Sequence, residues 1–385
     1  MLGMLAVHIQ LFAYPSLARW NPTAYGDLHG LNWWVWLATS LLADGKFIAI
    51  FAMLLGVSIV MQADRAGGRA ARRAHLRRMA VLLLLGLLHA YLLWYGDMLV
   101  PLALCGTLVF AARGFRPSRL LVLGVLVFAA GSVLSFALTW STAQSDPVAL
   151  AAWRAQWTPR PATIALEIAQ YRGTWAEQMA HRVPAALETE TAHFLTQLLW
   201  QMSGLMLIGM GLLKLGVLTA ARSRAFYVRM GAVGFGGGTL LIGLGLWRSF
   251  STGWDLLDFM LVSQQLHYWG NLLVALGWTA LVMWLVQRGW PLRLVAAAGR
   301  VALTNYLLQS VICTTIFYGY GFGLFGRVDR AGQLGIVVAI WAFQVLGSAA
   351  WLRAFAVGPV EWITRWLVSG RRPSFVRASP VVAGV

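Results

Sequence analysis

Five ionisable side chains interrupt apolar stretches in the first hundred residues: His8, Asp44, Lys46, His89 and Asp97. Ionisable groups are costly in an apolar environment and mark functional sites by default. An aspartate that orients a neighbouring histidine lets the imidazole act as a general base, as acyl transfer to a hydroxyl requires. We therefore take His8, His89 and Asp97 as candidate catalytic residues. Asp44 and Lys46 are candidate substrate contacts.

The same side chains have a purely structural interpretation. His89 and Asp97 could hydrogen-bond helix ends, and Lys46 could extend to the interface or pair with Asp44. A second polar cluster raises the same question. Asn305 and Gln309 are four positions apart and share a helix face, and Tyr306 lies beside them. All three are candidate substrate contacts, and hydrogen bonding between helices explains them equally well.

The elements that carry these residues must be membrane helices. Of the 385 residues, 59% are hydrophobic and 11% are charged, against about 25% charged in soluble domains. This composition excludes a soluble domain, a disordered chain and a disulfide scaffold. The two cysteines, Cys105 and Cys313, lie in apolar runs, and we expect inert buried thiols and no metal site.

Apolar runs of about 20 residues predict helices that cross a bilayer. The predicted fold is all-α, with ten transmembrane helices near 1–14, 44–62, 79–96, 97–112, 120–142, 191–217, 230–250, 266–287, 294–318 and 333–352. The short apolar stretch 31–43 is predicted to be interfacial. Gly234 and Gly238 form a GxxxG pair, which predicts close helix packing. Glu361 is predicted to pair with Arg365 on an amphipathic surface helix.

The net charge of +17 acts mainly as a topology signal. If both termini are cytoplasmic, 21 of the 30 basic residues lie in cytoplasmic segments, and only two acidic residues do. This distribution follows the positive-inside rule. It favours a membrane protein over a nucleic-acid-binding one. The arginine-rich segment 64–78 is then expected to contact anionic lipid head groups.

Four segments follow from this assignment: 1–142 with five helices, 143–190 on the outer side, 191–370 with the remaining helices, and a disordered tail at 371–385. Helical spacing within 162–182 predicts one amphipathic helix on the outer surface. The first predicted span begins at Met1 without a hydrophilic lead. We expect residues to be missing before Met1.

Long motifs resemble the YeiB-like membrane proteins, the domain-of-unknown-function 418 family. The matching segments are FAMLLGVSI (51–59), GLLHAYLLWYGDMLVPLALCG (86–106), YRGTWAEQMAHR (171–182), GRVALTNYLLQSVICTTIFY with GYGFGLFG (299–326) and WLRAFAVGPVEWITRWL (351–367). The resemblance covers nearly the whole chain. It implies a polytopic bacterial inner-membrane protein distantly related to membrane acyltransferases, including the acyltransferase-3 and heparan-glucosaminide acetyltransferase types.

The resemblance also implies roles for particular residues. In the wider group, the first helix contains an arginine and, after ten intervening residues, a histidine. His8 occupies the histidine position, and the arginine would precede Met1. By analogy with these relatives, acyl-coenzyme A is the expected donor. The arginines expected to hold its phosphates are Arg77, Arg78, Arg113 and Arg300.

The leading functional hypothesis is therefore a membrane acyltransferase that carries an acyl group from a cytoplasmic donor to an acceptor at the outer face. The alternative is a transporter or flippase for a small or amphipathic solute, in which buried polar residues form a translocation path. A third interpretation is a non-catalytic structural or sensor protein. The lipid bilayer is the expected partner, and a homo-oligomer is compatible with the sequence.

Overall fold

The computed structural model describes residues 1–377. This part of the chain is helical, and its only β-type pairing is an isolated bridge between Phe355 and Val376. The helices are α1 (Leu2–Ala13), α2 (Gly30–Leu42), α3 (Lys46–Ala66), α4 (Gly68–Leu88), α5 (Leu99–Val109), α6 (Pro117–Ser145), α7 (Pro147–Trp157), α8 (Pro161–Arg172), α9 (Trp175–Glu188), α10 (Leu199–Lys214), α11 (Arg224–Ser251), α12 (Leu256–Asp258), α13 (Gln264–Gln287), α14 (Arg293–Arg300), α15 (Ala302–Phe317), α16 (Arg330–Ala354) and α17 (Pro359–Ser369). The all-α prediction is confirmed for the described residues.

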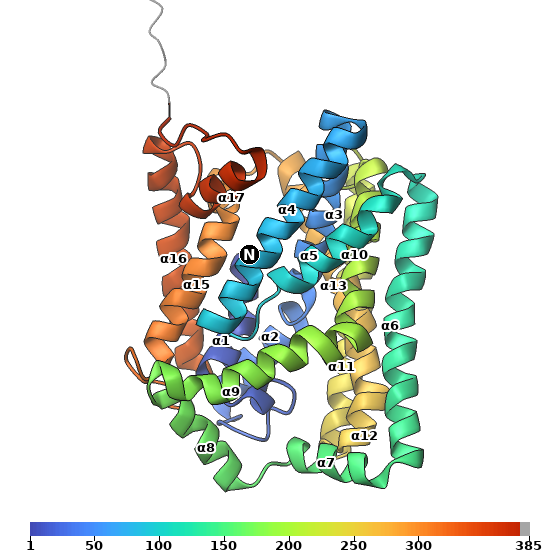
Figure 1. Cartoon of the computed structure of the whole chain (residues 1–385). Helices are drawn as coiled ribbons and strands as arrows, with labels where there is room; N and C mark the ends of the chain where they lie inside the picture. Colours follow the sequence, from blue (N-terminus) through green and yellow to red (C-terminus); the bar gives the residue numbers. More distant parts are fainter. Residues whose placement is uncertain (378–385) are drawn as a thin grey trace, which may run out of the picture.

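Seven helical segments are long and apolar enough to cross a membrane. They are Gly30–Asp64, Gly68–Leu93, Pro117–Ser145, Trp175–Lys214, Arg224–Ser251, Leu256–Gln287 and Arg330–Ala354. Three shorter apolar helices, Leu2–Ala13, Leu99–Gly114 and Ala302–Phe317, fall on other predicted spans. Long helices such as α6 and α16 run between the two ends of one bundle (Figure 1). The chain therefore has the architecture of a polytopic membrane protein, and the ten-span arrangement stays a prediction.

The prediction of one helix across 294–318 is wrong. Helix α14 ends at Arg300, Val301 leaves helical geometry at φ −116° and ψ 37°, and α15 begins at Ala302. The reason is a side chain from α17. The Glu361 carboxylate accepts hydrogen bonds from the backbone N–H groups of Leu303 (2.7 Å) and Thr304 (3.1 Å), which the first turn of a helix leaves without partners.

Glu361 also accepts a hydrogen bond from the hydroxyl of Thr304. The predicted pair with Arg365 is therefore wrong, because this carboxylate is used to cap α15. An acidic group at a helix N-terminus satisfies orphan donors and interacts favourably with the helix dipole. The contact fixes α17 against the beginning of α15.

The predicted single helix over 162–182 is also wrong, because Gly173 ends α8 and Thr174 begins a new helix. The Thr174 hydroxyl accepts from the Glu177 backbone, and the Glu177 carboxylate accepts from the Thr174 backbone. This reciprocal pair is a capping box. Helices α7, α8 and α9 form a layer across one end of the bundle (Figure 1).

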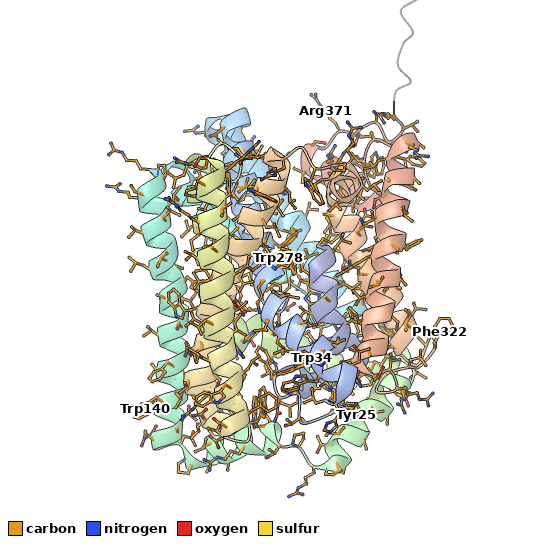
Figure 2. The ribbon with its side chains drawn as sticks, turned by 180° about the vertical axis from the view of Figure 1, so that it is seen from behind. Tyr25, Trp34, Trp140, Trp278, Phe322 and Arg371 are labelled. Atoms are coloured by element: carbon orange, nitrogen blue, oxygen red, sulfur yellow. The ribbon has the colours of Figure 1, made fainter. Side chains whose placement is uncertain are left out.

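The opposite end carries α17 and the connection between α3 and α4 (Figure 1). Arg371 lies at this end, whereas Trp140, Tyr25 and Phe322 lie towards the other (Figure 2). The arginine-rich connection and the C-terminal region are thus together, far from α7–α9. This arrangement matches the charge asymmetry that the sequence analysis used for orientation.

Helices α11 and α13 pack closely through glycines, as the GxxxG pair predicts. A Cβ atom on Gly234 would lie 2.6 Å from the backbone nitrogen of Gly277, and one on Gly238 would lie 2.6 Å from a methyl carbon of Val274. Both distances are too short for a real side chain. The absence of Cβ atoms therefore permits this helix contact.

Part of the predicted disordered tail packs against the helices. The backbone nitrogen of Ala356 donates to Phe375, and the Trp362 indole donates to the carbonyl of Pro373 at 2.8 Å. The Phe375 ring also lies 4.9 Å from the Phe355 ring. Hydrogen bonds and the Phe375 ring thus hold this part of the tail against the helices. The remainder of the tail prediction, 378–385, lies outside the described residues.

Candidate functional site

His89 and Asp97 form a buried pair where α4 ends. His89 is the first residue of a π-helical segment, His89–Leu93, and Asp97 lies just before α5. The His89 Nδ1 and Asp97 Oδ1 atoms are 2.7 Å apart, and each residue is only 2% exposed. π-Helical turns are frequent at functional sites because they redirect side chains that a regular helix would place elsewhere.

The neighbours of Asp97 fix its carboxylate. Val100 donates its backbone N–H to Asp97 Oδ2 at 2.8 Å, and the Tyr306 hydroxyl donates to Oδ1 at 3.4 Å. Gly86 permits α4 to approach Asp97 closely, since a Cβ atom on this glycine would lie 2.9 Å from the Asp97 Oδ2 atom. A carboxylate that receives these donors acts as an acceptor only. We therefore assign the hydrogen of the His89 ring to Nδ1, which leaves the Nε2 lone pair free to accept.

Ser310 completes this chain of hydrogen bonds, and the sequence analysis did not identify it. Its Oγ lies 2.7 Å from His89 Nε2, and the residue is 2% exposed. With His89 protonated on Nδ1, the serine hydroxyl is the donor. The available signal was helical spacing: Ser310 is four residues after Tyr306 and shares its face of α15.

His8 lies near this chain without joining it. Its ring centroid is 5.0 Å from that of Trp94, and the Trp94 ring is in turn 6.2 Å from that of His89. Phe12 stacks on Trp94 at 4.1 Å. The indole therefore packs against both candidate histidines.

A cavity of about 810 Å³ adjoins the site. Its wall combines the connection between α1 and α2 with parts of α8, α9, α10 and α13. It therefore lies towards the α7–α9 end of the bundle (Figure 1). Four of the five ionisable residues singled out from the sequence line it: His8, Asp44, Lys46 and Asp97. His89 lies behind Asp97.

Asp44 and Lys46 are not paired with each other. Asp44 Oδ1 pairs with the Arg19 guanidinium at 3.1 Å. The Lys46 ammonium, 1% exposed, donates to the backbone carbonyl of Ser40. A buried ammonium that borders a cavity can attract an acidic or strongly polar ligand.

A second histidine–carboxylate pair lines the same cavity, and the sequence analysis did not identify it either. His181 Nε2 on α9 lies 3.5 Å from Glu167 Oε1 on α8. The Glu167 carboxylate also accepts from the Ser16 backbone at 2.9 Å. The ring of Tyr171 packs 5.2 Å from that of His181, and burial raises the pKa of the Tyr171 hydroxyl well above its usual value.

The polar residues of α15 contact two different parts of the structure, α16 and Asp97. Asn305 donates to the Ser348 hydroxyl at 2.9 Å, and Gln309 donates to Gln344 Oε1 at 2.7 Å. Both bonds reach α16, and neither Asn305 nor Gln309 lines the cavity described above. Tyr306 instead joins the site through Asp97.

The four arginines proposed for an acyl donor contact different neighbours. Arg78 donates to the Ser58 hydroxyl at 2.6 Å, Arg113 stacks 3.9 Å above the Phe110 ring, and Arg300 donates to the carbonyl of Ala356 at 3.5 Å. Arg77 is exposed. Within residues 1–377, no three His, Cys, Asp or Glu side chains are arranged to hold a metal ion.

The fold and site define a class: all-helical polytopic membrane proteins with a buried histidine–aspartate pair beside a cavity that polar side chains line in part. Comparison with known sequences gives the family. The model described as "Protein of unknown function (DUF418)" matches residues 212–371. The uncharacterised protein YeiB of Escherichia coli (strain K12) is 32% identical over 372 residues, which cover 95% of this chain and 92% of that protein. The chain belongs to the YeiB-like DUF418 family.

Two further relatives were found. The uncharacterised protein YxaH of Bacillus subtilis (strain 168) is 28% identical over 94% of this chain and 90% of its own length. An uncharacterised 39.9 kDa protein of Bacillus acidopullulyticus is 36% identical over 19% of this chain and 21% of its own length. No solved structure matches the chain.

Proposed function

We propose that this chain is a bacterial inner-membrane acyltransferase, which moves an acyl group from a cytoplasmic donor to an acceptor reached from the outer face. One observation carries the proposal. The His89–Asp97 pair, with its 2.7 Å hydrogen bond, lies directly behind a cavity wall to which Asp97 itself contributes. A base oriented by a carboxylate beside a binding cavity is the arrangement that acyl transfer needs.

The chemistry follows from the assigned tautomer. The Nε2 lone pair of His89 removes a proton from the hydroxyl or amine that attacks the acyl carbonyl, once that group takes the place of the Ser310 hydroxyl at this nitrogen. The ring becomes an imidazolium, and the negative Asp97 carboxylate at Nδ1 stabilises that charge. His89 then returns the proton to the leaving group. Burial strengthens these interactions, since little water competes for them.

The cavity is the proposed acceptor site. Its volume of about 810 Å³ falls within the usual range for small-molecule pockets. The cavity wall includes three side-chain amides, those of Gln197, Gln201 and Asn271, and the aromatic ring of Trp36. Amides orient a polar acceptor through hydrogen bonds, and an aromatic face contacts its less polar parts. Lys46, His8 and Asp44 complete the proposed binding surface.

The orientation supports a donor from the cytoplasm. The arginine-rich connection and the C-terminal region gather at the end away from α7–α9 (Figure 1). Positive residues near membrane helices face the cytoplasm. Arg77, Arg78, Arg113 and Arg300 belong to this end in the proposed topology, where they would attract the phosphates of acyl-coenzyme A or anionic lipid head groups.

Transport of a small or amphipathic solute is the second candidate. Two further π-helical segments, Thr189–Leu198 and Phe259–Ser263, contribute His193 and Phe259 to the cavity wall. The α14–α15 break is a further discontinuity. Interrupted helices near a central site are typical of transporters. Histidine–carboxylate chains also relay protons in transporters. We favour acyl transfer because the oriented base adjoins a cavity of small-molecule size.

The test is acyl transfer by the purified full-length protein in detergent or vesicles. Acetyl- and octanoyl-coenzyme A are the donors, and release of free coenzyme A is measured. His89→Gln should lower the rate by at least about a hundredfold, the usual contribution of a general base. His75→Gln is the matched control. His75 is also buried on α4, but it bonds the carbonyl of Gly106 at 3.0 Å.

Equal activity of wild type and His89→Gln would contradict the assigned base. No turnover with either donor, together with solute flux through vesicles that His89→Gln abolishes, would replace the acyltransferase proposal with transport.

A further inference from the structure

We infer that Ser310 is the nucleophile of a covalent acyl-transfer step, in which a thioester donor first acylates Ser310 and the acceptor then takes the acyl group from it. The inference rests on the proposed function and deepens it, because it names an acyl-enzyme intermediate. It adds one residue, Ser310, to the His89–Asp97 pair.

The geometry provides each contact that the step requires. Ser310 Oγ and Asp97 Oδ1 lie 2.7 Å from the two opposite ring nitrogens of His89. The three residues come from α15, the α4 terminus and the segment before α5. A nucleophile, a base and an orienting carboxylate in this order form the arrangement that activates a serine for acyl transfer, whatever the fold.

The Ser310 hydroxyl is directed at the histidine rather than at its own helix. Serine and threonine within helices often donate to the carbonyl four residues earlier. On α15, Thr314 and Thr315 do so, to Ser310 and Val311, both at 2.7 Å. Among the described residues, His89 is the single hydrogen-bond partner of the Ser310 hydroxyl. Its proton therefore points to the Nε2 lone pair.

The step balances as two proton-coupled transfers. The Ser310 proton moves to His89 Nε2 while Oγ bonds to the carbonyl carbon of an acyl thioester. The carbon–sulfur bond breaks, and the departing thiolate takes the proton from His89. A hydroxyl or amine of the acceptor then gives its proton to His89 and attacks the ester carbon. The bond to Oγ breaks, and Ser310 recovers its proton.

Ser310 is 2% exposed and does not line the cavity, so side chains beside the site must move for a donor to reach it. The Trp94 indole packs against both His8 on the cavity wall and His89, and it is fully buried. Its Nε1 has no hydrogen-bond partner within residues 1–377. Movement of the indole would therefore break no hydrogen bond of its own side chain.

The experiment uses a fluorophosphonate probe, which reacts with activated serines and does not depend on the donor. The full-length protein is labelled and digested with trypsin. The modified site is then located by mass spectrometry on the peptide 301–327, which arginines at 300 and 327 delimit. Wild type should be labelled at Ser310, and His89→Gln should lower the labelling rate at least about a hundredfold. Ser203→Ala, which alters another buried serine on α10, should label like wild type.

A second measurement follows the acyl group itself. With isotopically labelled acetyl-coenzyme A and no acceptor, the same peptide should gain one acetyl group at Ser310. Ser310→Cys should convert this ester to a thioester, which neutral hydroxylamine releases. A purely structural serine would show neither adduct.

Acyl transfer without any adduct or fluorophosphonate label at Ser310, and with Ser310→Ala within about threefold of wild type, would overturn the inference and leave the proposed function intact. His89 would then activate the acceptor directly. Absence of both transfer and labelling would overturn the two proposals together.

Discussion

The carboxylate of Asp97 and the imidazole of His89 lie 2.7 Å apart at the end of α4, and the backbone of Val100 holds the second carboxylate oxygen. The carboxylate thereby determines which nitrogen of His89 carries the hydrogen. This makes the protonation of the ring, rather than the mere presence of a histidine, the property to test.

Replacement of Asp97 by asparagine should abolish acyl transfer while the fold is retained. The amide can donate to Nδ1, which favours the tautomer that lacks a free lone pair at Nε2. We expect a fall in kcat of about 10³- to 10⁴-fold with a small change in KM, as this substitution produces in other carboxylate–histidine pairs. The measurement is the initial rate against donor concentration.

The matched control for this substitution is Asp258→Asn. The Asp258 carboxylate is also charge-paired, but its partner is Arg248 on α11, at 2.7 Å. The Asp258→Asn variant should transfer acyl groups within about twofold of the wild-type rate. Equal losses in both variants would show that Asp97 acts through general stability and not through His89.

Glu361 should stabilise the protein through α15 and not through Arg365. Its removal in Glu361→Ala leaves the backbone donors of Leu303 and Thr304 without a partner, and loss of a helix cap costs about 0.5–2 kcal/mol. The thermal midpoint in detergent should fall. Arg365→Ala should leave the thermal midpoint unchanged. Equal decreases in the midpoint of the two variants would instead support the Glu361–Arg365 ion pair that the sequence predicts.

The helix positions were predictable because run length and hydropathy decide them locally. Each apolar stretch must become a helix to satisfy its own backbone in lipid. The break at Val301 was not predictable, because the capping carboxylate comes from Glu361, sixty positions later. The end of α8 was predictable after all. Threonine at 174 followed by glutamate at 177 is the capping-box pattern, which marks the start of a new helix despite the apolar periodicity that continues across it.

The site was predictable in part for a similar reason. His89 and Asp97 are eight positions apart at the boundary of two apolar runs, so local distance alone suggested their contact. Ser310 is 221 positions from His89, and only the packing of α15 against the α4 terminus brings them together. Serine is also common in helices. Its type alone therefore gives no signal of a catalytic position.

The glycines of α11 should differ sharply in their tolerance of a methyl group. In Gly238→Ala the new Cβ would meet Val274 N at 2.8 Å and the carbonyl of Gly270 at 2.9 Å, so backbone must move. Such overpacking costs about 1–3 kcal/mol. Gly243→Ala on the same helix meets nothing within 4 Å and should be neutral or slightly stabilising. Thermal unfolding in detergent measures both, and equal midpoints would contradict the close α11–α13 contact.

The orientation can be tested with single cysteines, because Cys105 and Cys313 are fully buried and should leave wild type unlabelled. Ala151 on α7 and Ala74 in the arginine-rich part of α4 are both exposed and lie in segments that the charge distribution assigns to opposite sides. In intact cells, a membrane-impermeant maleimide should label Ala151→Cys and label Ala74→Cys only after lysis. Positive charge resists translocation, so the end with most of the arginines stays inside. The reverse labelling pattern would place the cavity on the cytoplasmic side and remove the outer-face acceptor from the proposed reaction.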